Sequence, residues 1–222
     1  MNSGHANRAA IWLVLWSLAG LAGLFLAAWV GSVLGALVLS FHKIFIALWA
    51  AFLVAVLYLS RDPDPVEPSD LNAVVSPAHG RVETIEDTME HGFMSGACKR
   101  ISIVVAWTDV QVQYAPVAGT LTWCEYRPAA KMDGVAKPES LWIGLDVVGR
   151  PETKMAVGLV AGSWGRHILP WVRSGDVVAR AERLGMMRPA QRVELILPAR
   201  LKLLVNPGDE VTGGQSIVAK FE

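Results

Sequence analysis

The sequence predicts a mainly β domain on an N-terminal membrane anchor of two helices, and two observations lead to this fold class. Of the 222 residues, the first 60 contain only two charged side chains, Arg8 and Lys43. Residues 61–222 carry the remaining charge and show no apolar repeat of helical period. We therefore expect an anchor at residues 1–60, a proline-rich linker at 61–70 and a β domain at 71–222.

The uncharged segments on either side of Lys43 predict two transmembrane helices. A helix needs about 20 residues to cross about 30 Å of hydrocarbon, and the whole run is long enough for two. The first helix is expected at about residues 10–30, and the second is expected to end near Leu59. Residues 31–35 and residues 40–43 are both candidates for the turn, and the sequence does not choose between them.

A helical hairpin of this kind places Arg8 and Arg61 on the same side of the membrane. Under the positive-inside rule that side is cytoplasmic. We therefore expect a protein of the bacterial inner membrane whose β domain lies in the cytoplasm.

Short runs rich in valine, isoleucine, leucine and tryptophan, separated by glycine and proline, predict the strands of the β domain. This spacing is typical of a sandwich or a barrel-like fold. The clearest runs are residues 72–76, 81–85, 100–107, 119–126, 141–148, 155–161 and 191–197.

Two segments near the C-terminus share the pattern Val-x-x-Gly-Asp-x-Val, with Leu or Ile near the end of each segment. They are residues 172–184 and residues 205–217. The Gly-Asp pair supplies the backbone angles of a tight turn, and the second valine anchors the next strand. The repeat therefore predicts two equivalent turns in one domain.

The charge balance argues against a general nucleic-acid binder. Residues 61–222 contain 18 basic and 20 acidic residues, whereas nucleic-acid binding needs a clustered basic excess. Residues 166–202 are locally basic, with eight basic residues against three acidic ones. A basic face next to a bilayer attracts anionic phospholipid headgroups, and an ordinary solvated face is the alternative interpretation.

Four motifs, in the same order along the chain, resemble the phosphatidylserine decarboxylase family. They are Arg61-Asp-Pro63, Ser76-Pro-Ala-His-Gly80, Asp109-Val-Gln-Val-Gln-Tyr-Ala-Pro116 and Leu184-Gly-Met-Met-Arg-Pro-Ala-Gln-Arg-Val-Glu-Leu-Ile-Leu-Pro198. The resemblance implies the β fold of that family, which contains the interlocked hairpins of biotinyl and lipoyl carrier domains. The repeated turns would belong to those hairpins.

The same resemblance implies that the catalytic groups of the family are missing. In the family, a Gly-Ser pair cuts its own backbone, and the serine becomes the pyruvoyl group that performs the decarboxylation. Ala190 and Gln191 stand at that pair. His79 and Gln111 stand at the aspartate and the histidine that activate the serine. A glutamine amide is neither a nucleophile nor a base near neutral pH, so we expect three degenerate positions, no catalytic residue and no pyruvoyl cofactor.

Three other residues that are able to carry chemistry have ordinary interpretations. Ser163 follows a glycine, but this Gly-Ser pair matches a family strand well ahead of the cleavage turn. His167 is interpreted as a structural histidine. His91 lies near acidic residues without a spacing specific for a metal, so we expect no metal site.

The predicted function is that of a catalytically inactive, membrane-anchored protein related to phosphatidylserine decarboxylase. We expect an accessory or assembly subunit of a membrane protein complex, or a phospholipid-binding protein. The alternative is an active phosphatidylserine decarboxylase that makes phosphatidylethanolamine with another nucleophile. The expected partners are accordingly the membrane, anionic phospholipid and a membrane protein complex, and nucleic acid is not among them.

Overall fold

The computed structural model describes residues 4–59, 61, 63–90, 93–94, 96–132, 135–150, 152–161, 168–187 and 190–221. The chain divides into two compact units, Met1–Val56 and Leu57–Glu222. Helix α1 (Gly4–Leu59) runs through the first unit and ends within the second, which is otherwise a mainly β domain.

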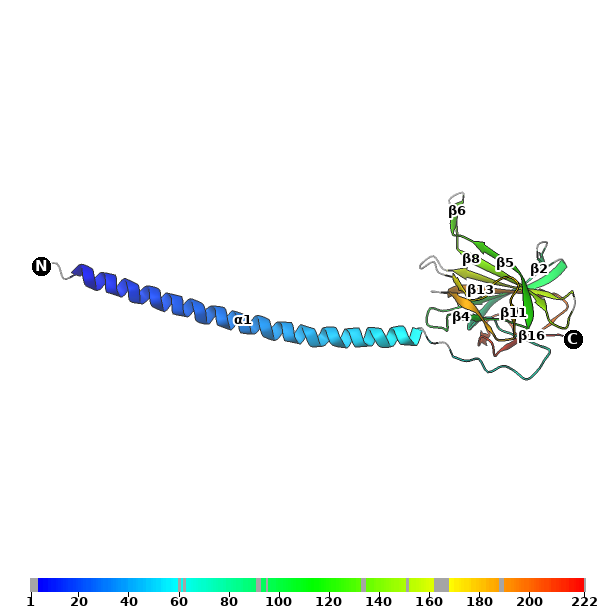
Figure 1. The fold of residues 1–222 in the computed structure, drawn as a ribbon, viewed down its shortest axis with the longest axis horizontal. Coiled ribbons are helices and arrows are strands. Elements are labelled where there is room, and N and C mark those ends of the chain that lie inside the picture. Colours follow the sequence, from blue (N-terminus) through cyan, green and yellow to red (C-terminus); the bar gives the residue numbers. More distant parts are fainter. Residues whose placement is uncertain are drawn as a thin grey trace. The chain divides into compact units, whose positions relative to one another are not determined.

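Helix α1 is continuous through the positions where the sequence predicts a turn (Figure 1). No proline lies within it. The hydroxyl groups of Ser32 and Ser40 donate to the carbonyl groups of Trp29 (2.7 Å) and Ala36 (2.9 Å), so both serines satisfy their hydrogen bonds inside the helix. The two-helix anchor is therefore not confirmed.

One segment of α1, Leu15–Tyr58, is long and apolar enough to cross a membrane, with 44 residues and a mean hydropathy of 2.2. Its large apolar side chains are exposed along the helix. At 1.5 Å per residue the segment spans about 66 Å, more than twice the thickness of a hydrocarbon core. The helix therefore suggests membrane association.

The β domain is built from short and medium-length strands. They are β1 (Ala73–Val75), β2 (Gly80–Glu90), β3 (Gly96–Val104), β4 (Val112–Tyr114), β5 (Gly119–Arg127), β6 (Ala130–Met132), β7 (Val135–Lys137), β8 (Ser140–Val147), β9 (Lys154–Ala161), β10 (Ile168–Pro170), β11 (Val177–Val178), β12 (Arg183–Met187), β13 (Ala190–Pro198), β14 (Lys202–Leu203), β15 (Glu210–Val211) and β16 (Ile217–Lys220). Each of the seven runs that predict strands corresponds to one of them, namely β1, β2, β3, β5, β8, β9 and β13.

The largest sheet contains eight antiparallel strands in the order β11, β5, β8, β9, β13, β3, β2 and β15. It is strongly curled (Figure 1). Three smaller sheets have the orders β1-β16-β14, β10-β12-β4 and β6-β7. The curled sheet and the first two small sheets enclose the core, so the prediction of a mainly β domain is confirmed.

Alternation along the central strands separates a buried inner face from an outer face. On β13, Val193, Leu195 and Leu197 are fully buried in the main core, while Glu194 lies on the other face. The neighbouring strands add Ile101, Ile103, Leu141, Ile143, Leu145, Met155, Val157 and Leu159 to the same core. Period-two burial of this kind holds each strand in register, because a slip by one residue turns the apolar side chains outward.

The repeated pattern near the C-terminus forms two equivalent turns, as predicted. Gly175 and Gly208 both have a φ of +99°. In the first turn, the carboxylate of Asp176 accepts a hydrogen bond from the amide of the residue three positions earlier (2.7 Å), and Asp209 accepts the matching bond in the second turn (2.8 Å). The glycine supplies the left-handed backbone and the aspartate closes the turn.

Both turns also dock on the large sheet in the same way. The amide of Gly175 donates to the carbonyl of Leu121 on β5 (2.7 Å), and the amide of Gly208 donates to the carbonyl of Val82 on β2 (2.8 Å). The turns thus brace the two ends of the sheet. Their kinship with the hairpins of biotinyl and lipoyl carriers is not confirmed.

The segment between the anchor and β1 lies along the β domain and is held there by Arg180, whose side chain is only 9% exposed. Its Nε donates to Glu67 Oε1 (2.7 Å). Its other nitrogens donate to the carbonyl groups of Pro68 (2.7 Å), Ala73 (3.2 Å) and Asp70. One guanidinium group therefore satisfies four acceptors of the linker and of β1.

Other arginines of the locally basic segment are also paired within the domain. Arg183 binds Asp64 at 2.7 Å, and Arg192 binds Glu83 at 2.7 Å. These carboxylates, like that of Glu67, lie outside residues 166–202. Three of the eight basic residues are thus neutralised, and the predicted basic face is weaker than the composition of the segment indicates.

Candidate functional site

His79 lies at the end of the turn that leads into β2. Ser76 stabilises this turn, because its hydroxyl donates to the carbonyl of Ala78 at 2.7 Å. Gly80 follows with a φ of +147°, and a Cβ there would lie 2.2 Å from the carbonyl oxygen of Val104. Glycine is therefore required at residue 80. The close approach of β2 to β3 at this glycine fixes the position of the backbone of His79, which precedes it.

Gln111 lies in the loop that leads into β4 and is 4% exposed. Its Nε2 donates to the carbonyl of Ala106 (3.0 Å) and to the carbonyl of Asp109 (2.9 Å). Asp109 strengthens the same loop, since its carboxylate accepts from the amide of Ala106 at 2.9 Å. The two donors of the glutamine amide are thus committed to backbone carbonyls, and the side chain acts as a brace of the loop.

Residue 191 lies at the start of β13, where the structure describes the backbone but not the side chains of residues 190 and 191. Val104 of β3 pairs with Arg192 on one side and with Arg81 on the other. Because neighbouring strands lie about 4.8 Å apart, residue 191 and His79 approach the same end of β3 from opposite sides.

Gln111 joins this group through β12. The amide of Met187 donates to the backbone carbonyl of Gln111 at 3.1 Å, and β13 begins three residues later. The backbones at residues 79, 111 and 191 therefore converge around the end of β3.

A hollow of about 410 Å³ lies beside His79 and Val104, at the end of β3. His79 and Asp109 line it together with Arg81 and Glu210, and the remaining lining residues are Gly80, Val104, Ala106, Val211 and Thr212. Among the described residues, His79 Nδ1 has no hydrogen-bond partner although it is buried. An unpaired buried nitrogen is a costly feature in a folded protein, and because His79 also lines this hollow, we take the hollow as the candidate site.

Burial lowers the pKa of His79 below its ordinary value of 6.5. The positive charge of Arg61 acts in the same direction, while the carboxylate of Asp109 opposes the shift. Arg61 is nearby because its Nη2 donates to the carbonyl of Thr108 at 3.2 Å. The imidazole is therefore neutral at neutral pH, and one nitrogen is available as an acceptor.

This lowered pKa predicts that the β domain loses stability as the pH falls below the ordinary histidine pKa of 6.5. The unfolded chain binds a proton on this histidine near pH 6.5, while the folded protein resists protonation, so acid favours unfolding. The contribution is present above the unfolded pKa and is lost as the pH falls through the folded one. Unfolding curves in detergent should show a smaller acid-dependent loss for His79→Gln; identical pH profiles would contradict the assignment.

Two residues next to His79 were not singled out by sequence reasoning. The ring of Tyr114, which is fully buried, lies 6.0 Å from the imidazole between centroids. A Cβ at Gly213 would lie 2.9 Å from His79 Nδ1 and 2.8 Å from the Tyr114 ring. The glycine therefore provides the space in which both rings fit, and only the fold brings residue 213 to this place.

Three other candidate residues, His91, Ser163 and His167, lie outside the residues that the structure describes. Within the described ranges, no group of three or more His, Cys, Asp or Glu side chains is arranged to hold a metal ion.

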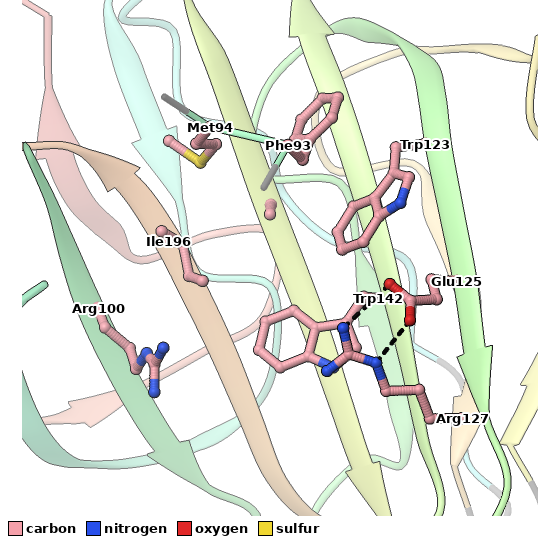
Figure 2. Close-up of a pocket in the computed structure, with 9 residues that line it drawn as sticks. Phe93, Met94, Arg100, Trp123, Glu125, Arg127, Trp142 and Ile196 are labelled. Carbon is pink, nitrogen blue, oxygen red and sulfur yellow. Dashed lines mark hydrogen bonds and ion pairs between the residues drawn. The ribbon is translucent and has the colours of Figure 1, made fainter. Parts of the chain in front are cut away.

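A second hollow, of about 390 Å³, opens on the outer face of the large sheet (Figure 2). Phe93 and Trp123 stack there with centroids 5.5 Å apart and an interplanar angle of 10°. Trp142 lies over Gly158, where a Cβ would come within 2.7 Å of its ring. The missing side chain of the glycine thus allows the indole to lie flat on the sheet.

The rim of this outer hollow carries charge (Figure 2). Arg127 makes two hydrogen bonds to the carboxylate of Glu125, at 2.8 and 3.0 Å. Its guanidinium carbon lies 5.9 Å from the ring centroid of Trp142. Met94 and Ile196 complete the apolar wall, and Arg100 also lines the hollow, so this is an aromatic surface with a charged rim.

The sequence profile of the phosphatidylserine decarboxylase family matches residues 52–219, well over half of the chain. The chain belongs to the phosphatidylserine decarboxylase family. It is 34% identical over 193 residues to the phosphatidylserine decarboxylase proenzyme of Symbiobacterium thermophilum, covering 85% of this chain and 89% of that protein. This chain is also 33% identical over 170 residues to the proenzyme of Desulfotalea psychrophila, covering 74% of this chain and 78% of that protein. It is 32% identical over 165 residues to the proenzyme of Syntrophus aciditrophicus, covering 72% of this chain and 77% of that protein.

The match to the phosphatidylserine decarboxylase family includes the three positions that the sequence predicts to be degenerate. It covers the turn with His79, the loop with Gln111 and the start of β13 with residue 191. The three positions that the motifs place at catalytic residues of the family therefore lie inside the matched segment and not outside it.

Proposed function

We propose that this protein is a catalytically inactive member of the phosphatidylserine decarboxylase family that binds phospholipid without decarboxylating it. The observation that carries the proposal is the glutamine at residue 191, at the position of the self-cleaving serine. Self-cleavage needs a hydroxyl to attack the preceding carbonyl, and an amide side chain supplies none. Without that step no pyruvoyl group forms.

The surroundings of residue 191 support this interpretation. The Gln111 amide donates both of its hydrogen bonds to backbone carbonyls and has no basic nitrogen to take up a proton. Ser76, a serine close to His79, is fully buried and donates its hydroxyl to the carbonyl of Ala78. The hollow at His79 retains space for a polar ligand, so binding is the function that remains.

The decisive test is the intact mass of the full chain, purified in detergent and incubated with phosphatidylserine. We expect one uncut polypeptide of about the 24.0 kDa given by the sequence, with bound lipid recovered as phosphatidylserine. Two fragments that meet near residue 190 or near Ser163, or the appearance of phosphatidylethanolamine, would establish the alternative of an active decarboxylase.

A second candidate function is that of an accessory or assembly subunit in a membrane complex. The aromatic hollow on the outer face of the sheet favours it, because Trp and Phe side chains gathered in an open concave surface are typical of the centres of protein interfaces. Trp142 and Phe93 would be the anchors of such an interface (Figure 2). Both candidate functions share the same absence of catalysis and differ in the hollow that they use.

We further propose that α1 enters and leaves the bacterial inner membrane on the cytoplasmic side. The apolar segment of 44 residues is long enough for two crossings of about 20 residues each. Two crossings require a break in the middle of α1, where Gly31 and Gly35 are the weakest helix formers. Reporter tags at the N-terminus and the C-terminus should both report the cytoplasm, and tags on opposite sides would mean a single crossing.

A further inference from the structure

Two arginines of the β domain face a hollow that is separate from the candidate site. Arg150 lies in the turn between β8 and β9, and Arg200 lies in the turn between β13 and β14. Both line a hollow of about 320 Å³, with Thr153, Leu201 and Phe221 as the other lining residues. This hollow shares no lining residue with the one at His79.

The guanidinium group of Arg150 is held in place by neutral partners. Its Nη2 donates to Asn72 Oδ1 at 2.6 Å, and its Cζ lies 3.9 Å from the ring centroid of Phe221. The ring is itself positioned, because the amide of Phe221 donates to the carbonyl of Asn72 at 3.1 Å. Stacking on an aromatic face orients the planar guanidinium without using its charge on a carboxylate.

Arg200 approaches the same hollow from the opposite turn. Its Nη2 donates to Thr153 Oγ1, and Thr153 is only 3% exposed. Because the hydroxyl oxygen is the acceptor in this bond, the hydroxyl proton stays available as a donor. The amide of Thr153 also donates to the carbonyl of Arg150 at 3.1 Å. The hydroxyl group of Thr153 and the guanidinium group of Arg150 therefore belong to the same turn.

Among the described residues, neither arginine pairs with a carboxylate. Most other arginines of the domain do so within 4 Å, namely Arg81, Arg100, Arg127, Arg180, Arg183 and Arg192. Two oriented guanidinium groups with neutral hydrogen-bond partners therefore bring positive charge and unused donors to one hollow. Guanidinium groups of this kind match the geometry of an oxyanion.

We propose that Arg150, Thr153 and Arg200 form a binding site for a phosphate monoester or for inorganic phosphate. Two guanidinium charges match the charge of about −1.5 to −2 that a phosphate monoester carries near neutral pH, which a carboxylate does not reach. The apolar side chains of Leu201 and Phe221 lie beside the donors and suit the carbon atoms of an ester. The site does not depend on whether the chain cleaves itself or on what the hollow at His79 binds.

The test uses the full chain in a non-ionic detergent, titrated with inorganic phosphate, with dioctanoyl phosphatidic acid and with dioctanoylglycerol. The last two ligands differ only by the phosphate group. We expect saturable binding of a phosphate-bearing ligand and none of dioctanoylglycerol. Binding of both inorganic phosphate and phosphatidic acid identifies the phosphate alone as the ligand, whereas binding of phosphatidic acid only identifies a lipid headgroup.

Three variants locate the binding. Arg200→Gln removes an exposed side chain and should weaken binding about tenfold or more, since each charge-assisted hydrogen bond contributes this much. Arg200→Lys keeps the charge and should retain part of the affinity. Arg173→Gln removes an equally exposed arginine from another turn and should leave binding unchanged.

The proposal is overturned if no phosphate-bearing ligand shows saturable binding. It is also overturned if Arg173→Gln weakens binding as much as Arg200→Gln, because the attraction would then come from net charge and not from the site.

Discussion

Restoring the family residues at five positions should make the chain cut itself into two fragments. The substitutions are His79→Asp, Gln111→His, Pro189→Phe, Ala190→Gly and Gln191→Ser. They place an acid, a base and a nucleophile at residues 79, 111 and 191 and remove a proline that holds φ near −65° immediately before residues 190 and 191. The expected result is slow processing at residues 190 and 191, seen as two polypeptides by mass spectrometry.

The geometry around β3 is the physical reason to expect this gain of processing. Val104 pairs with Arg81 on one side and Arg192 on the other, and the amide of Met187 binds the carbonyl of Gln111. The backbone at the three positions thus already converges. A histidine at residue 111 would replace a glutamine that is 4% exposed, so its ring would remain inside the loop.

The control is the four-fold variant that retains Gln191, which should stay whole because it lacks the hydroxyl. If the five-fold variant folds and also stays whole over several days, the side chains at the three positions do not meet. The likeness to the family would then extend to the strands and not to the site.

The sequence predicted the long central strands because their burial alternates with period two. Val193, Leu195 and Leu197 show this on β13, and they lie in the core. The short strands β4, β10 and β12 were not predicted, since strands of three to five residues show little periodicity and depend on their neighbours for strand geometry; among the described strands of this length, only β1 lies in a predicted run. The turn within α1 was predicted from length alone, and the structure instead continues the helix through residues 31–43.

Likewise, the candidate site was predictable only where the resemblance supplied motifs. These motifs gave residues 79, 111 and 191, but they did not give Tyr114 and Gly213 as neighbours of His79, because those contacts join distant parts of the chain. The linker shows the same limit. Its prolines predicted an extended segment, but its partner, Arg180, lies about a hundred residues away and no local pattern identifies it.

Arg180→Ala should lower the free energy of unfolding of the β domain by about 2–4 kcal/mol. The substitution leaves three backbone carbonyl groups of the linker and β1 without their donor, and each unsatisfied carbonyl in a partly buried position costs about 1–3 kcal/mol unless water replaces the donor. Denaturant unfolding in detergent measures the loss, and hydrogen exchange of the amides at residues 64–73 should increase with it.

Arg81→Ala is the matched control. The side chains of Arg81 and Glu210, which form an ion pair, are 65% and 81% exposed respectively, and such a pair contributes no more than about 1 kcal/mol. Equal stability of the two variants, with unchanged exchange in the linker, would show that the segment is not held by Arg180.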